Sequence, residues 1–306
     1  MCKLACSGSI DDRRAGSRLW GPKVTTIAGS TVLTGIIGWP VAHSLSPAMH
    51  NAAFAALGLD MAYVPLPVAA RQLEAAVGGL RALGFRGANV TMPHKAAVLP
   101  FLDHVSDDAR LIAAVNTIVV VDDALHGFNT DVAGFMAALR EVVAEPLDGA
   151  SALVLGAGGA ARAAVLGLLR LKVRRLTVVN RSPARAEELI RLLGALDDQA
   201  RFEVVALDAL AAAQVREADI LVNATPLGMN EPLKVPGVLV DTMRRDHIVF
   251  DVVYGQRSTM PVERARAIGA RAIDGVGMLA WQAALSFELW TGRDAPLEVM
   301  RSAARR

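Results

Sequence analysis

A glycine-rich hexapeptide in the middle of the chain has the spacing of a phosphate-binding turn. Gly156-Ala157-Gly158-Gly159-Ala160-Ala161 follows the apolar run 152–155 and precedes a stretch of helical periodicity. In this G-x-G-x-x-A pattern the first glycine permits a tight turn, the second lets the backbone approach a pyrophosphate, and the small last residue allows close helix packing. A glycine pattern alone also suits a purely structural turn. The strand before it and the helix after it favour dinucleotide binding, with phosphates at the helix N-terminus.

The residues after the next predicted strand indicate which dinucleotide is bound. That strand ends at Asn180, near the place where an NAD-selective site commonly has an acidic residue, roughly 20 residues beyond the first glycine. This chain has Arg181, Ser182 and Arg185 there. A guanidinium suits a 2′-phosphate through charge-assisted hydrogen bonds. The alternative is two solvated arginines at a helix start, but their position after the strand favours NADP.

Composition limits the remaining classes of protein. The 306 residues allow two domains of roughly 100–200 residues each, and the 53% hydrophobic content supports a sizeable core. The net charge of +2, the lack of a basic block and the lack of a long apolar run give no reason to expect nucleic acid or a membrane as a partner. Cys2 and Cys6 are too few for a disulfide framework or a metal site and suggest a reducing, cytoplasmic compartment. The six histidines lack metal-ligand spacing, so we expect no metal.

Strands alternate with helices on both sides of the polar, breaker-rich segment 145–149, which predicts an α/β protein with two domains and mainly parallel sheets. The strands and helices after residue 149 alternate in the way that is typical of a doubly wound nucleotide-binding sheet. Residues 1–28 lack periodicity and are predicted to be a disordered extension. The predicted strands are 32–38, 62–66, 88–91, 117–121, 152–155, 176–179, 220–222 and 248–252, and the predicted helices include 47–57, 71–83, 106–113 and 278–290.

A set of short motifs, in one order along the chain, resembles the shikimate dehydrogenase family. The likeness runs from about residue 34 to residue 292, and the number of motifs in sequence makes coincidence a poor explanation. Besides the glycine-rich turn, the motifs are Gly38-Trp39-Pro40-Val41-Ala42-His43-Ser44-Leu45-Ser46-Pro47, Asn89-Val90-Thr91-Met92-Pro93-His94-Lys95, Ala114-Val115-Asn116-Thr117, Asn129-Thr130-Asp131, Asn180-Arg181-Ser182, Asn223-Ala224-Thr225-Pro226-Leu227-Gly228-Met229, and Asp274-Gly275-Val276-Gly277-Met278-Leu279 with Gln282.

The resemblance implies a fold, an activity and partners. Residues 29–131 with 276–306 would form a substrate-binding catalytic domain, and residues 132–275 a Rossmann-like NADP-binding domain. The small-molecule substrate would lie in the cleft between them. The implied reaction is the reversible NADPH-dependent reduction of 3-dehydroshikimate to shikimate, an oxidoreductase step of aromatic amino-acid biosynthesis, carried out by a monomer or homodimer.

The resemblance also assigns the proton transfer that must accompany hydride transfer to Lys95 and Asp131. A lysine in a partly desolvated cleft can exchange a proton near neutral pH, and a carboxylate beside it orients the ammonium. Without the resemblance, Lys95 would read as an exposed lysine and Asp131 as the N-cap of the following helix. The residue types do not rank base against orienter, since such a pair can titrate as one unit.

The other site residues are implied in the same way. Ser44 and Ser46 would bind the substrate carboxylate, although without the resemblance local turn and N-cap bonding ahead of the helix is the favoured explanation for them. Thr91, Asn116 and Gln282 would bind hydroxyl groups rather than only satisfy backbone, and Tyr254 would line the pocket. The loop after Tyr254 departs from the family pattern, which commonly has a proline two residues after the tyrosine. Gly255 in this chain should make the loop looser. On the cofactor side the resemblance implies Gly156, Ala157, Gly158, Gly159, Ala160, Asn180, Arg181, Ser182, Arg185, Val252, Gly275 and Asp107, the last of which is also an ordinary acidic residue at a helix start.

Three alternatives stay open. The nearest is a quinate/shikimate dehydrogenase with relaxed use of substrate or of NAD. A protein of another class, a non-catalytic sensor of a nucleotide or metabolite, would bind without turnover, and the presence of Lys95 and Asp131 weighs against it. A two-domain dehydrogenase acting on amino or folate substrates would leave Ser44-Leu45-Ser46 unexplained.

Overall fold

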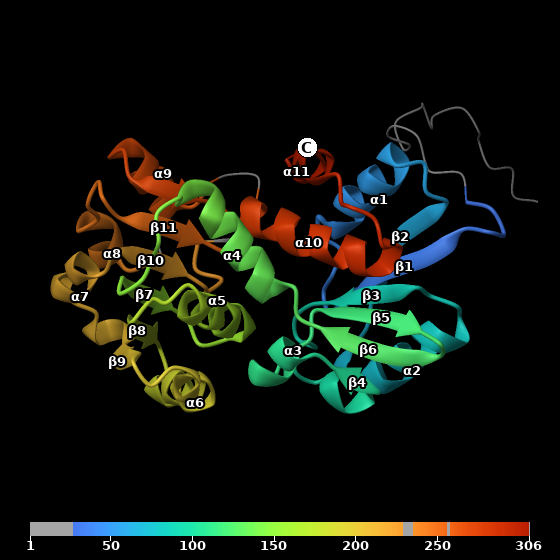
Figure 1. Cartoon of the computed structure of the whole chain (residues 1–306), viewed down its shortest axis with the longest axis horizontal. Coiled ribbons are helices and arrows are strands. Elements are labelled where there is room, and N and C mark those ends of the chain that lie inside the picture. Colours follow the sequence, from blue (N-terminus) through green and yellow to red (C-terminus); the bar gives the residue numbers. More distant parts are fainter. Residues whose placement is uncertain (1–26, 229–234, 256–257, 306) are drawn as a thin grey trace, which may run out of the picture.

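The computed structural model of the chain describes residues 27–228, 235–255 and 258–305. Almost all of the extension predicted at residues 1–28 lies outside these ranges. Met229, the last residue of the Asn223–Met229 motif, and Gln256 and Arg257 of the loop after Tyr254 lie outside them as well. The described residues form two lobes, each built around a six-stranded sheet (Figure 1). The predicted α/β class is confirmed.

The first sheet belongs to the N-terminal half and has the order β2-β1-β3-β5-β6-β4. Its strands are β1 (Val32–Gly38), β2 (Met61–Pro67), β3 (Gly87–Val90), β4 (His104–Val105), β5 (Thr117–Val121) and β6 (Ala124–Phe128). β1 runs parallel to β2 and β3, whereas β5 is antiparallel to both β3 and β6. A two-residue turn at Asp122 and Asp123, both with positive φ, joins β5 to β6. The sheet is therefore mixed, because this hairpin adds to the predicted βαβ units.

The second sheet has the order β12-β11-β10-β7-β8-β9, with every pair of neighbours parallel. Its strands are β7 (Ser151–Leu155), β8 (Arg175–Asn180), β9 (Arg201–Ala206), β10 (Ile220–Asn223), β11 (Ile248–Asp251) and β12 (Arg271–Ile273). This is the doubly wound order, in which the order of the strands along the sheet reverses between β7 and β10 while the strands stay parallel, and ligands bind at the carboxyl ends of the strands there. The predicted Rossmann-like domain is thus present, with two further edge strands.

Helices cover both sheets. Around the first sheet lie α1 (Ser46–Ala56), α2 (Leu73–Ala82) and α3 (Asp107–Leu111), and around the second lie α5 (Gly159–Arg170), α6 (Pro183–Leu193), α7 (Ala212–Glu217), α8 (Gly237–Asp241) and α9 (Met260–Ala267). No helix in the described part of the chain is long and apolar enough to cross a bilayer.

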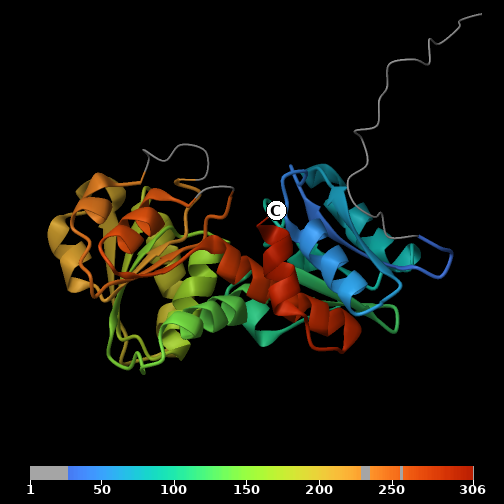
Figure 2. The same ribbon diagram turned by 90° about the horizontal axis from the view of Figure 1, so that it is seen from above.

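Two further helices, α4 (Asp131–Val142) and α10 (Gly275–Thr291), join the lobes, and they are followed by the last helix, α11 (Leu297–Ala304). α10 packs against α4 and α1, and α11 packs against α1, so the end of the chain returns to the first lobe (Figure 2). Trp290 of α10 is 1% exposed and donates its indole N–H to the carbonyl of Ile118 in β5 at 2.9 Å. Trp290 is therefore part of the core of the first lobe.

Helices α3 and α5 hold the lobes together beside the cleft. Arg170 of α5 forms an ion pair with Asp108 of α3, and Arg162 of α5 donates to the carbonyl of Ile112 at 3.3 Å. Ile112 also packs in the same apolar cluster as the buried face of α5. The N-terminus of α5, which carries the glycine-rich turn, is thereby fixed relative to the first lobe.

Candidate active site

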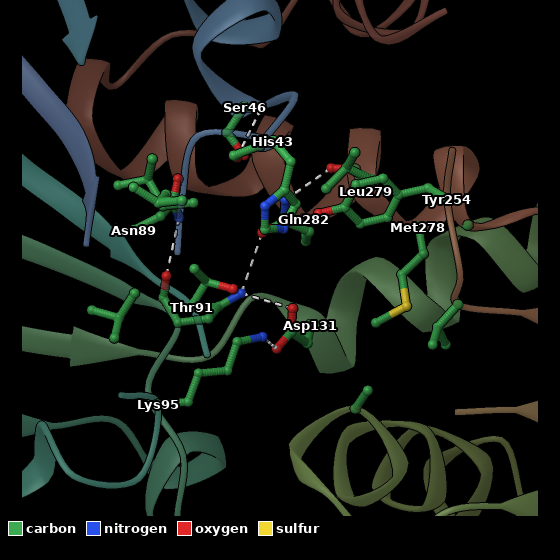
Figure 3. Close-up of a pocket in the computed structure, with 18 of the residues that line it drawn as sticks. His43, Ser46, Asn89, Thr91, Lys95, Asp131, Tyr254, Met278, Leu279 and Gln282 are labelled. Atoms are coloured by element: carbon green, nitrogen blue, oxygen red, sulfur yellow. Dashed lines mark hydrogen bonds and ion pairs between the residues drawn. The ribbon is translucent and has the colours of Figure 1, made fainter. Parts of the chain in front are cut away.

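A cavity of about 160 Å³ lies between the two lobes (Figure 3). This is smaller than the roughly 300–1,000 Å³ of pockets for drug-sized ligands and suits a small polar molecule. All eight residues that the resemblance assigned to catalysis and substrate binding line it: Ser44, Ser46, Thr91, Lys95, Asn116, Asp131, Tyr254 and Gln282. Three of the expected cofactor residues, Ala160, Val252 and Gly275, line its other side.

Lys95 and Asp131 form an ion pair at the floor of this cavity. Lys95 lies in the loop after β3, Asp131 is the first residue of α4, and Nζ donates to Oδ2 at 2.7 Å. The lysine side chain is 23% exposed and the aspartate side chain 8%. Asp131 is not the N-cap of the helix, the alternative that its position suggested: Thr130 occupies that position, and the side chain of Asn129 accepts the Asp131 amide. The carboxylate of Asp131 is therefore free to face Lys95.

Asn116 fixes the second oxygen of this carboxylate. Its Nδ2 donates to Asp131 Oδ1 at 2.9 Å and also lies 3.3 Å from Gln282 Oε1 of α10. Its Oδ1 accepts the backbone amide of Thr130 at 2.8 Å. Both Asp131 oxygens thus have a hydrogen-bond donor, which holds the carboxylate in one orientation. Asn116 thus links the first sheet with α4 and α10 in a single site.

Asn89, which opens the Asn89–Lys95 motif but was given no role from the sequence, also lines the cavity. It is 4% exposed, accepts the Tyr63 hydroxyl at 2.7 Å, and donates to the carbonyl of Asn116 and to Ser286 Oγ. Burial raises the pKa of Tyr63 well above its ordinary value, so the phenol remains a donor. The available signal was a polar side chain within the four-residue, fully buried strand β3.

The loop before α1 supplies the serine pair. The backbone amide of Ser46 donates to Ser44 Oγ at 3.3 Å, and α1 begins at Ser46 with a proline in its first turn. Ser44 therefore makes the local turn bond that its position suggested, but Leu45 rather than a serine occupies the N-cap. His43, which belongs to the same motif but was given no role from the sequence, points into the cavity from the same loop (Figure 3).

Tyr254 approaches the Lys95–Asp131 pair from the second lobe, in the loop after β11. Burial raises the pKa of its phenol, and the negative charge of Asp131 raises it further. Tyr254 therefore remains a neutral hydroxyl near the Asp131 carboxylate. The cavity thus collects hydroxyl and amide groups around one cation, an arrangement that can bind a small anion carrying several hydroxyl groups.

The glycine-rich turn fits a dinucleotide. Gly156 has φ +111°, and a Cβ there would lie 2.9 Å from the carbonyl of Ala224, so only glycine makes this turn without strain. A Cβ on Gly158 would meet nothing within 4 Å, and one on Gly159 would first meet Lys95 Cδ at 3.9 Å. The N-terminus of α5 therefore faces open space and Lys95. Its amides can receive a pyrophosphate there.

Arg181, Ser182 and Arg185 lie exposed where β8 ends and α6 begins. Asn180 Nδ2 donates to the carbonyl of Ser182 at 2.8 Å and shapes this turn. Within the described residues neither arginine takes part in an ion pair, so both guanidinium groups can receive a phosphate.

Asp107 is not brought to the cavity. It is the first residue of α3, its side chain is 91% exposed, and it pairs with Arg110 at 3.2 Å. It lines a separate surface groove together with Phe128 and Leu289. As an acidic residue in the first turn of a helix, it favours the helix dipole. The contact near the nicotinamide that the resemblance implied stays a prediction.

The strand order of the second sheet, its glycine-rich turn and the Lys95–Asp131 pair define a two-domain, dinucleotide-dependent dehydrogenase. Family models agree: residues 36–118 match the shikimate dehydrogenase substrate binding domain, residues 138–251 match shikimate / quinate 5-dehydrogenase, and residues 275–305 match the shikimate 5'-dehydrogenase C-terminal domain. The chain belongs to the shikimate dehydrogenase family.

Individual relatives span nearly the whole chain. A shikimate dehydrogenase (NADP(+)) of Rubrobacter xylanophilus is 50% identical over 284 residues, covering 92% of this chain and 98% of the relative. The crystal structure of shikimate 5-dehydrogenase from Thermus thermophilus in complex with NADP(H) and shikimate has a TM-score of 0.80 and 39% identity, covering 90% and 99% of the two chains. The ligand-free 5-ketofructose reductase of Gluconobacter sp. strain CHM43 has a TM-score of 0.82 and 35% identity, with the same coverage.

Proposed function

We propose that this chain catalyses the reversible, NADPH-dependent reduction of 3-dehydroshikimate to shikimate. The observation that carries the proposal is the Lys95–Asp131 ion pair, which lies in a small polar cavity and faces the glycine-rich turn. In this proposal residues 29–131 with 276–306 bind the substrate and residues 132–275 bind NADP. The names of the relatives, among them a complex with NADP(H) and shikimate, support the same assignment.

Each group in the cavity has a role in this reaction. Bound NADPH supplies the hydride. Lys95 Nζ delivers the proton to the carbonyl oxygen during reduction and takes it back during oxidation, while Asp131, held by Asn116, orients the ammonium. Ser44 and Ser46 bind the substrate carboxylate. Thr91, Asn116 and Gln282 bind ring hydroxyls, and Tyr254 closes the pocket from the second lobe.

Steady-state kinetics with shikimate and quinate, each with NADP and with NAD, tests the proposal. We expect the highest kcat/KM for shikimate with NADP. Quinate carries an additional hydroxyl at the carboxylate-bearing carbon, and a neutral polar pocket can tolerate it. An equal or higher kcat/KM with quinate would show that the chain is a quinate/shikimate dehydrogenase instead. Reduction of 5-ketofructose in preference to 3-dehydroshikimate would show that the substrate belongs to another class. Binding of NADPH without turnover of any substrate would support the sensor alternative.

Arg181→Ala is expected to raise the KM for NADP by roughly tenfold or more, because charge-assisted hydrogen bonds to the 2′-phosphate are lost. The KM for NAD should stay nearly unchanged, since NAD lacks that phosphate. The control is Arg191→Ala, which removes an exposed arginine from the last turn of the same helix α6. An equal effect of Arg181→Ala on NADP and NAD would exclude the 2′-phosphate role.

The remaining inferences concern the setting of the protein. We infer a cytoplasmic enzyme from the use of only two cysteines, Cys2 and Cys6. We also infer a monomer or homodimer, which light scattering of the purified full chain would distinguish from larger assemblies.

A further inference from the structure

A buried carboxylate at the end of β11 takes no part in the chemistry proposed above. Asp251 is 0% exposed. Its Oδ1 accepts the backbone amide of Val253 at 2.9 Å, and its Oδ2 accepts the Thr259 hydroxyl at 2.6 Å. Within the described residues no basic group pairs with it, and burial raises its pKa. Neutral donors alone therefore stabilise this carboxylate, and each of them matters more than it would on the surface.

Asn223, at the end of the neighbouring strand β10, is the third donor. Its Nδ2 lies 3.0 and 3.1 Å from the two oxygens of Asp251, and it also donates to the carbonyl of Leu227. Its Oδ1 accepts the hydroxyl of Thr225 at 2.6 Å. One side-chain network thus joins the loop after β10, the loop after β11 and the start of α9.

The segment held by this network forms part of the cavity wall. Val252 and Tyr254 both line the cavity, and they flank Val253, whose amide is bound by Asp251. The amide of Val252 donates to the carbonyl of Asn223 at 2.9 Å. On the other side Gly275 packs so closely that a Cβ there would lie 2.4 Å from the carbonyl of Val253. The backbone of residues 252–254 is therefore held from both sides.

We propose that Asp251, Asn223 and Thr259 form a clamp that positions Tyr254 against the substrate, and that all three are positioning residues for the reaction. The inference rests on the proposed function, because Tyr254 must contact the substrate for its position to matter. The clamp spans the carboxyl ends of two adjacent parallel strands, which is where a doubly wound sheet places its ligand. Loss of one donor leaves a buried carboxylate partly unsatisfied and lets the 252–254 segment shift.

Thr259→Val tests the clamp, because it removes one hydroxyl donor with little change in volume. We expect kcat/KM for shikimate to fall by about tenfold or more, since a displacement of about 1 Å in a positioning group can cost up to 10²-fold. Thr259→Ser, which restores the hydroxyl, should recover kcat/KM to within about threefold of wild type. Asp251→Asn, which keeps the shape but replaces one acceptor by a donor, should reproduce the loss if Thr259→Val does not fold.

Two measurements separate positioning from general destabilisation. Ser151→Ala removes a buried hydroxyl that donates to Asp219 at the opposite end of the same sheet; it should lower the Tm while leaving kcat/KM within about twofold of wild type. In a Tyr254→Phe background, Thr259→Val should cost less than about threefold, because the clamp acts through Tyr254 and the two effects are coupled.

The outcomes are distinct. Unchanged kcat/KM in Thr259→Val, or losses in Thr259→Val and Ser151→Ala that follow their Tm values alike, would overturn the clamp. Full additivity with Tyr254→Phe would overturn it as well. Failure of the wild-type chain to turn over shikimate with NADP would instead refute the proposed function.

Discussion

Replacing Lys95 by alanine is expected to lower kcat for shikimate oxidation by at least about 10²-fold, the scale of a lost proton-transfer group. The KM for shikimate should change much less, because the carboxylate and hydroxyl contacts of the substrate come from Ser44, Ser46 and the neutral polar groups. The physical reason is that hydride transfer moves no proton, and Lys95 Nζ is the cation that lies in the cavity within 2.7 Å of a carboxylate. The rate of NADPH formation, followed by its absorbance in stopped-flow or steady-state experiments, measures the effect.

Asp131→Asn extends this test to the partner group. It keeps the side-chain shape but removes the charge that orients the ammonium, so kcat should fall as well. The double variant should fall by much less than the product of the two single losses, because the two residues act as a unit. Arg140→Ala, at an exposed cation on the same helix as Asp131, is the control and should leave kcat unchanged. A Lys95→Ala enzyme within about fivefold of the wild-type kcat would remove Lys95 from the proton transfer.

The free energy of unfolding is expected to fall steeply as pH drops below 6.5, and His50 is the group responsible for much of the slope. His50 is 0% exposed in α1, stacks on Tyr63 at 4.4 Å between ring centroids, and has no hydrogen-bond partner for either ring nitrogen among the described residues. Burial lowers its pKa from 6.5 to about 3. Between these values the unfolded chain binds a proton that the folded chain does not, so acid favours unfolding.

The expected size of this contribution is large. It is present in full above pH 6.5 and is lost as pH falls toward 3, at up to about 1.4 kcal/mol per pH unit and roughly 4–5 kcal/mol in all. Denaturant unfolding at several pH values, compared between wild type and His50→Leu, measures the difference in slope. Met49→Leu, a change on the same buried face of α1 that removes no titratable group, should alter stability equally at every pH. If His50→Leu retains the wild-type slope, the buried imidazole is not its source.

Several strands could be read directly from local sequence. The predicted strand 32–38 coincides with β1, and the short apolar runs at 152–155 and 176–179 fall within β7 and β8. Such runs are informative because both faces of a central parallel strand are buried. The strands β4, β6, β9 and β12 were missed. β4, β9 and β12 are sheet edges that are short or carry exposed charged residues such as Arg201 and Glu203, and their pairing is decided by neighbours distant in sequence. β6 lies inside the sheet, but His126 and Gly127 interrupt its apolar run.

The candidate site, like the strands, could be predicted in part from the sequence. The glycine-rich turn could be interpreted from spacing alone, because the conformation of Gly156 and the helix that follows it are local properties. Residues without a local signal were harder. Asn89 and His43 line the cavity but were given no role, although both stand in motifs of the family, whereas Asp107 fits the family pattern yet faces solvent. Position along the chain does not say toward which side of a loop or helix a side chain points.

By itself, the sequence determined the α/β class, the dinucleotide turn, the preference for NADP suggested by Arg181 and Arg185, and the motifs that resemble one family. Only the tertiary structure decided that Lys95 and Asp131 meet, that Asn116 holds the Asp131 carboxylate, and that Asp251 lies buried behind Tyr254. The physical reason is that these contacts join segments far apart in the chain. Their geometry depends on how two sheets and the returning helix α10 pack, and on the burial that this packing imposes on each polar group.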